Sequence, residues 1–124
     1  MKKIVLVLIL ILSLASTGCS KNMNYEILAF GNSTSSEMSS SYKLFNGTKD
    51  TKLTVGEGES VEVKVDIVTK SGALDAFIYK DESKYDYEGH DISTSSFTVT
   101  LSEPGDYTIK VKAKKHKGSY SFTW

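Results

Sequence analysis

The amino-acid sequence predicts an all-β protein, an antiparallel β-sandwich or barrel of about 7–9 strands that follows a cleaved signal peptide. Apolar and polar residues alternate with a period of two along several segments, as in strands with one face in a core. Glycine-containing turn segments recur roughly every 8 to 15 residues, and no segment shows a helical period. Hydrophobic residues make up 40% of the chain, which is enough to form a core.

The charge balance bounds the class of protein. The chain has 124 residues, enough for one domain, and its 15 lysines balance 15 acidic residues with no arginine. Without residues 1–18, which we expect to be removed, 13 lysines stand against 15 acids and the net charge is −2. This balance excludes a strongly basic nucleic-acid-binding protein. We predict no nucleic-acid partner and no cofactor.

The chain begins with a segment typical of an export signal. Met1, Lys2 and Lys3 are followed by an unbroken aliphatic run at 4–12. A helix needs about 20 apolar residues to span a membrane, so this shorter run indicates the hydrophobic region of a signal peptide. Residues 1–18 are therefore predicted to be a signal peptide that is cleaved from the mature protein.

The segment Ala15-Ser16-Thr17-Gly18-Cys19 resembles the lipobox of bacterial lipoproteins, in which small residues and a glycine precede a cysteine. The resemblance implies cleavage before Cys19 and lipidation of Cys19 with diacylglycerol and palmitate. Two or more acyl chains anchor a protein stably, so the predicted location is the outer, extracytoplasmic face of the cell membrane. The alternative is a signal cut near Ala15 that leaves a thiol, which would be unusual in an oxidising compartment.

The segment after the cleavage site is predicted to be largely irregular. Residues 19–41 hold the lipidated Cys19, a polar leader at 20–24, a candidate first strand at 25–30 and a Ser-rich stretch at 31–41. Ser-rich stretches between periodic segments are typical of loops. We therefore interpret residues 31–41 as a loop or flexible segment.

Regular alternation begins at Tyr42, and residues 42–124 are predicted to form the β-sandwich domain. The pattern is clearest from Val61 to Ile67 and from Tyr107 to Ala113. The expected strands are 42–45, 51–55, 60–69, 73–80, 96–101, 107–113 and 119–124. The expected turns, each with a glycine, are 46–47, 56–59, 70–72, 103–106 and 115–118.

The stretch from Ser71 to Trp124 resembles the pre-peptidase C-terminal family, whose β-sandwich domains occur at the C-termini of secreted bacterial peptidases. The resemblance is carried by the strand GALDAFIY at 72–79, by FTVTL and PGDYTIKV within 97–111, and by the closing GSYSF at 118–122. It implies a jelly-roll-like fold and a non-catalytic accessory role.

The sequence gives little support to an enzyme. A Ser-His-Asp hydrolase needs a nucleophile on an exposing turn such as Gly-x-Ser-x-Gly, and the sequence contains no such motif. The two histidines, His90 and His116, are expected in polar turn regions, and neither has metal-ligand spacing to another His or Cys. We therefore predict no catalytic residue and no metal site, and a secreted hydrolase is disfavoured.

An acidic, tyrosine-bearing hairpin at 79–91 is the strongest candidate for a binding site. Aromatic rings beside carboxylates provide the flat apolar face and the hydrogen-bond acceptors that bind sugars. The candidate ligand-binding residues are Tyr79, Tyr85, Tyr87, Asp86 and Glu88. Other interpretations stay open: the rings pack within the sheet, the acids keep a sheet edge soluble, or they contribute oxygen ligands to calcium.

The sequence as a whole favours a membrane-anchored, non-catalytic surface lipoprotein that binds or supports an envelope partner, either a protein or a glycan. The alternative is a carbohydrate-binding module that uses hairpin 79–91. A row of lysines offers a further surface for anionic lipid or wall polymer, and its members are Lys110, Lys112, Lys114, Lys115 and Lys117.

Overall fold

The computed structural model describes residues 25–27 and 29–124. They form seven strands: β1 (Tyr25–Ile27), β2 (Phe30–Ser33), β3 (Glu37–Val55), β4 (Val61–Asp81), β5 (Lys84–Gly89), β6 (Ser95–Leu101) and β7 (Gly105–Thr123). Every pairing between them is antiparallel, so the predicted all-β, antiparallel class is confirmed. In this part of the chain, no helix has the length and apolar character needed to cross a membrane.

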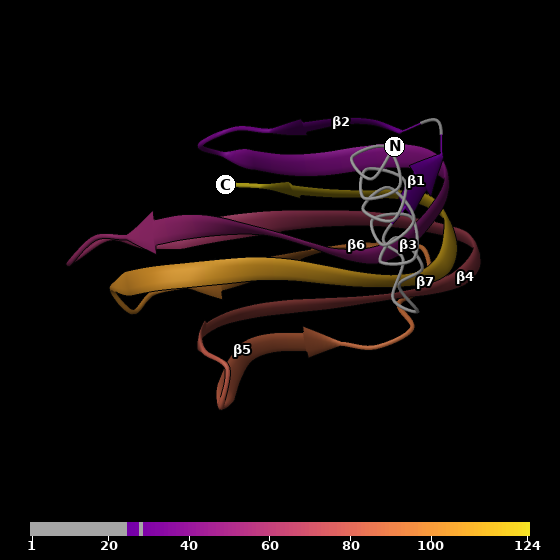
Figure 1. The fold of residues 1–124 in the computed structure, drawn as a ribbon. Coiled ribbons are helices and arrows are strands. Elements are labelled where there is room, and N and C mark those ends of the chain that lie inside the picture. Colours follow the sequence, from indigo (N-terminus) through magenta and orange to yellow (C-terminus); the bar gives the residue numbers. More distant parts are fainter. Residues whose placement is uncertain (1–24, 28) are drawn as a thin grey trace, which may run out of the picture.

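Three long strands, β3, β4 and β7, bend in the middle and thereby build both layers of the sandwich. The hydrogen-bonded order is β1-β3-β7-β4-β5, with β2 also on β3 and β6 also on β4. Register shifts interrupt the pairing at 42–47 in β3, at 69–73 in β4 and at 113–118 in β7. The three strands turn on the same side of the molecule, at the right in Figure 1. One sheet therefore folds over on itself.

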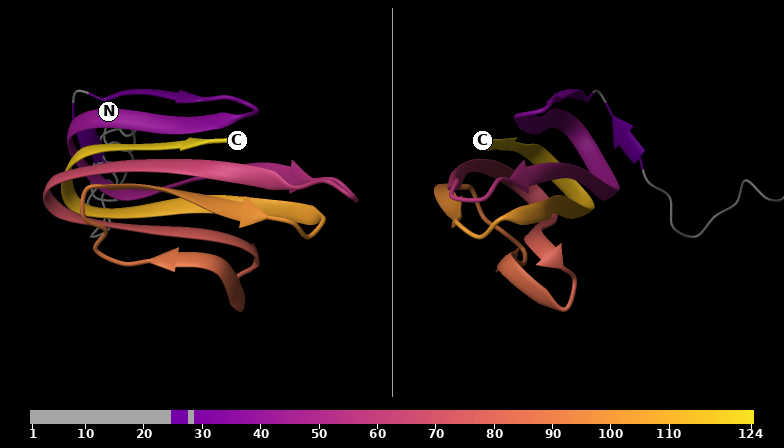
Figure 2. Two further views of the ribbon diagram at one scale, coloured as in Figure 1. Left: turned by 180° about the vertical axis from the view of Figure 1, so that it is seen from behind. Right: turned by 90° about the vertical axis from the view of Figure 1, so that its left-hand side faces the viewer.

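Each bend divides its strand between the two layers. One layer contains the first halves of β3 and β4 and the last half of β7, with β2 and β6 at its edges. The other layer contains the remaining halves, with β1 and β5 at its edges. Figure 2 shows the fold from behind and from one side. Because the same three strands are neighbours in both layers, the bends lie side by side.

The core-facing positions change phase at each bend. In β4, odd-numbered residues from Val63 to Ile67 are buried, and even-numbered residues from Leu74 to Ile78 are buried after the bend. In β7 the phase changes in the same way between Ala113 and Tyr120. An extra residue in one strand has this effect, because side chains alternate with a period of two. The bulges thus keep one continuous face of the sheet in the core.

Among the described residues, one main hydrophobic core fills the space between the two layers. Its buried members come from β3, β4, β6 and β7 and lie between residues 38 and 122. The three largest fully buried hydrophobic side chains are Tyr107, Phe45 and Phe122. A soluble fragment of residues 20–124 contains all of these core residues, and we therefore expect it to fold.

Three of the predicted turns are wrong. Residues 46–47, 70–72 and 115–118 do not form hairpin turns between separate strands, because they lie inside β3, β4 and β7, at the bends that carry each strand into the second layer. Each segment contains a glycine with a positive φ, which lets the strand bulge and continue in the second layer. The turns at 56–59 and 103–106 are confirmed by the ends of β3 and β6.

The Ser-rich stretch at 31–41 is not the predicted loop. β2 pairs with residues 38–41 of β3, and this part of β3 also pairs with the end of β7. Long-range pairing on both sides outweighs the low strand propensity of serine here. The predicted first strand at 25–30 divides into β1 and the start of β2 around Leu28, which lies outside the described residues.

Candidate functional site

The predicted binding hairpin is formed by β5 and the end of β4, and a bulge determines which way its tyrosines point. Tyr85 is opposite Tyr79 on β4, and Tyr87 is opposite Ile78, so Asp86 is an additional residue between the two pairs. Because Ile78 faces the core, the bulge places Tyr85 and Tyr87 on opposite faces of the sheet. Asp86 is exposed at the bulge itself.

Tyr87 packs inside the sandwich. Its ring lies 5.1 Å from the ring of Phe97 on β6, measured between centroids, and it packs against the main core. Burial raises the pKa of the Tyr87 hydroxyl. The ring therefore joins the two layers where β5 and β6 form their edges. Of the interpretations open at the sequence level, packing within the sheet describes Tyr87.

The outer face of the same hairpin carries a cluster of Phe77, Tyr79 and Tyr85, which we call the aromatic platform. Phe77 and Tyr79 are 6% and 7% exposed, whereas Tyr85 is 40% exposed. The Tyr85 ring centroid lies 5.1 Å from that of Phe77 and 5.4 Å from that of Tyr79. The two buried rings hold Tyr85 at the surface in a defined orientation.

Polar and charged groups surround the aromatic platform. His90 Nε2 lies 2.8 Å from a carboxylate oxygen of Glu88, and its Nδ1 lies 3.5 Å from Asp75. The hydrogen bond to Glu88, aided by Asp75, raises the pKa of His90. The ring centroids of His90 and Phe77 lie 5.5 Å apart in an edge-to-face arrangement, and Lys112 Nζ lies 5.6 Å from the Phe77 ring centroid.

The structure brings Tyr79, Tyr85 and Glu88 together and separates Tyr87 from them. Sequence reasoning missed Phe77 as part of the site, although the alternation within 73–80 places it on the same face as Tyr79. Among the described residues, no group of three or more His, Cys, Asp or Glu side chains could hold a metal ion. The predicted lipidation site, Cys19, lies outside the described residues.

His116 does not lie in the predicted polar turn; it is fully buried where the three strands bend. Tyr42 Oη is 2.6 Å from His116 Nδ1, and Thr69 Oγ1 is 2.8 Å from His116 Nε2. Thr69 donates its own hydroxyl proton to the Ile92 carbonyl, so the Nε2–H of His116 donates to Thr69 and Nδ1 accepts from Tyr42. Burial lowers the pKa of His116, and the ring is neutral.

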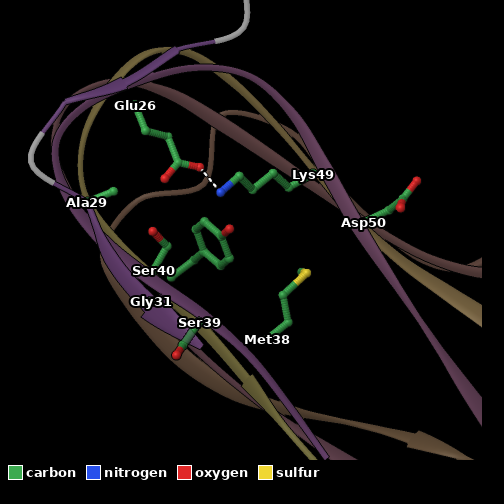
Figure 3. Close-up of a pocket in the computed structure, with 9 residues that line it drawn as sticks. Glu26, Ala29, Gly31, Met38, Ser39, Ser40, Lys49 and Asp50 are labelled. Carbon is green, nitrogen blue, oxygen red and sulfur yellow. Dashed lines mark ion pairs between the residues drawn. The ribbon is translucent and has the colours of Figure 1, made fainter. Parts of the chain in front are cut away.

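A pocket, which we call the edge pocket, opens between the layers beside β1 and β2 (Figure 3). Its volume is about 390 Å³. Its lining residues are Glu26, Ala29, Gly31, Met38, Ser39, Ser40, Lys49, Asp50 and Tyr120. Glu26 and Lys49 form an ion pair there. The pairing of β3 with β7 places Lys49 opposite the buried Val111, so its side chain leaves the sheet on the core-facing side, although it is half-exposed. The sequence contained no signal of this pocket, because residue 49 lies between the expected strands 42–45 and 51–55.

Comparison with known proteins finds similarity in solved structures only. No family model and no curated protein matches the chain. A pre-peptidase C-terminal domain of collagenase from Bacillus anthracis is 14% identical, with a TM-score of 0.45 over 62% of this chain and 75% of that chain.

Carbohydrate-binding domains are also among the similar structures. A xylan-binding domain from Paenibacillus barcinonensis is 13% identical, with a TM-score of 0.38 over 82% of this chain and 80% of that chain. A carbohydrate-binding module from a Cellvibrio mixtus lichenase, in complex with cellotriose, is 14% identical, with a TM-score of 0.40 over 85% of this chain and 84% of that chain. These similarities concern the β-sandwich fold.

Proposed function

We propose that this protein is a non-catalytic glycan-binding module, and that lipid on Cys19 anchors it to the outer face of the cell membrane. The observation that carries the glycan-binding part is the half-exposed Tyr85 ring on the aromatic platform. The hydrogen-bond partners of the two histidines support a non-catalytic role. They are Tyr42 and Thr69 for His116, and Glu88 and Asp75 for His90, so neither histidine is paired with a serine or a cysteine.

The aromatic platform has the two properties that sugar recognition needs. The exposed face of Tyr85 offers flat apolar area to the C–H face of a sugar ring, and little side-chain entropy is lost because Phe77 and Tyr79 already hold the ring. Glu88, His90 and Asp75 supply acceptors and a donor beside it for the sugar hydroxyls. An extended surface of this kind suits a chain of sugars that lies across the sheet.

The Tyr85→Ala variant of fragment 20–124 should lose retention on isolated cell walls and on a glycan array while remaining folded. Removing a half-exposed ring should cost about 1 kcal/mol of unfolding free energy. The matched variant is Tyr87→Ala, which removes a ring packed between the layers and should cost about 2 kcal/mol or more. Below its melting temperature, the Tyr87 variant should still bind.

Urea titration and a pull-down on the same two variants separate the roles. Retention by folded Tyr85→Ala equal to that of the original chain would exclude the aromatic platform as the glycan site. Loss of binding only in Tyr87→Ala would indicate that the site lies at the edge formed by β5 and β6.

The attachment to the membrane has its own test. The motif Gly18-Cys19 leads us to expect that Cys19→Ala moves the protein out of the membrane fraction, or leaves it as an uncleaved precursor. Intact-mass analysis of the protein purified from membranes should show acyl groups on an N-terminal Cys19. A mature terminus at another residue, together with an unmodified thiol, would contradict the proposed anchor.

A further inference from the structure

The edge pocket is a second place where polar groups converge. It is built from other strands than β4 and β5, which carry the rings of the aromatic platform. Glu26 comes from β1, Ser40 and Lys49 come from the two halves of β3, and Tyr120 comes from β7. Lys49 bonds to Glu26 across the pocket (Figure 3). The positive charge of Lys49 and the negative charge of Glu26 therefore neutralise each other in the pocket.

Ser40 shows that the pocket lacks a hydrogen-bonding partner. Its side chain is 5% exposed, and its Oγ has no hydrogen-bond partner among the described residues. Burying a hydroxyl without a partner costs free energy, which a ligand that bonds to it would recover. The neighbouring hydroxyl of Ser39 differs, because it donates to Glu37 at 3.1 Å.

The remaining lining groups define the character of the pocket. Asp50 lines the wall, but its carboxylate points away from Lys49 and the pocket in Figure 3. Met38 and Tyr120 are 4% and 2% exposed and provide apolar surface. Burial raises the pKa of the Tyr120 hydroxyl, which stays protonated as a donor. The pocket thus combines a paired carboxylate and ammonium, two hydroxyls and an apolar wall.

We propose that the edge pocket binds a single neutral, hydroxyl-rich ring, the size of one monosaccharide, as a free sugar or as the end of a glycan. A sugar hydroxyl both donates and accepts, so one ring can bond to Glu26, Lys49 and Ser40 together, whereas a charged ligand would disturb the ion pair. The volume of about 390 Å³ lies at the lower end of the roughly 300–1,000 Å³ of small-molecule pockets.

Titration of isotope-labelled fragment 20–124 with neutral methyl hexosides tests the proposal through backbone amide shifts. We expect saturable shifts at residues 26, 39–40 and 49–50. Ser40→Ala should weaken this binding about tenfold, the equivalent of one hydrogen bond of about 1.4 kcal/mol. The same substitution should leave the urea midpoint unchanged or raise it, since it removes an unsatisfied buried hydroxyl. A purely structural Ser40 would lower that midpoint.

Ser41→Ala is the matched control, because Ser41 lies next to Ser40 on β3 but is exposed and does not line the pocket. It should bind hexosides as the original chain does. Equal affinity in the two serine variants, or no saturable shift at these amides, would overturn the proposal. Binding of glycerol or of a uronate as tight as that of the hexosides would also overturn it. Tyr85→Ala should keep the shifts, because Tyr85 does not line this pocket. The test of the edge pocket is therefore independent of the test of the aromatic platform.

Discussion

Replacement of Gly118 by alanine should destabilise the sandwich by about 3 kcal/mol or more. Gly118 lies in the bend of β7 with a φ of +144°, a conformation that residues with a Cβ rarely adopt. A Cβ at this position would overlap the backbone carbonyl of Val68 on β4. Backbone cannot move aside as a flexible side chain can, so the pairing of β7 with β4 at the bend should open.

Gly58→Ala provides the control for this substitution. Gly58 also has a positive φ, of +74°, but a Cβ there meets no heavy atom within 4 Å. Gly58→Ala should therefore lower the free energy of unfolding only by the backbone strain, about 1 kcal/mol. Urea unfolding of both variants measures the difference. Equal losses would show that φ alone, and not the close approach of β7 to β4, makes glycine necessary at Gly118.

The bends explain why the strands could be predicted from the sequence and their connections could not. Alternation places each core-facing residue of 60–69, 73–80 and 107–113 correctly, because a half-buried strand needs only its own period of two. A glycine at the point where the buried positions change between odd and even numbers is compatible both with a hairpin turn and with a bulge in one continuous strand. The choice depends on which strands pair beyond it, and here β3, β7 and β4 remain neighbours on both sides.

The candidate site was predictable to a similar degree. The composition of 79–91 indicated a tyrosine-bearing hairpin, and Tyr79, Tyr85 and Glu88 lie together on its outer face. The separation of Tyr87 depends on the bulge at Asp86, which the local sequence does not reveal. The position of Lys49 follows from the pairing of β3 with β7, and its partner Glu26 is distant in sequence and becomes its neighbour only through folding.

His116 connects the strands at the place where all three bend, and its removal should cost about 3 kcal/mol or more. The ring is fully buried, and it bonds to Tyr42 on β3 and to Thr69 on β4. His116→Ala would leave a cavity, would leave the Tyr42 hydroxyl without its acceptor and would remove the donor to the Thr69 hydroxyl. The loss should be measured at pH 8, where the histidine is neutral in both the folded and the unfolded chain.

The pH dependence of stability should distinguish His116 from His90. Burial lowers the folded-state pKa of His116 below its ordinary 6.5, so the unfolded chain takes up a proton first as the pH falls. Its contribution is therefore complete above pH 6.5 and is lost on acidification, with a slope of at most about 1.4 kcal/mol per pH unit. The pKa of His90 is raised, so its contribution is present at low pH and is lost as the pH rises.

Urea midpoints measured from pH 8 to pH 5 should resolve these opposite contributions. His90→Ala removes the opposing contribution, so its stability should fall more steeply with acid than that of the original chain. Adding His116→Ala should then flatten the curve in this window. The carboxyl pKa values of Glu103 and Asp81 are lowered, so their contributions decline only below about pH 4.5, outside the window. An unchanged slope after loss of His116 would mean that the buried ring titrates as it does in the unfolded chain.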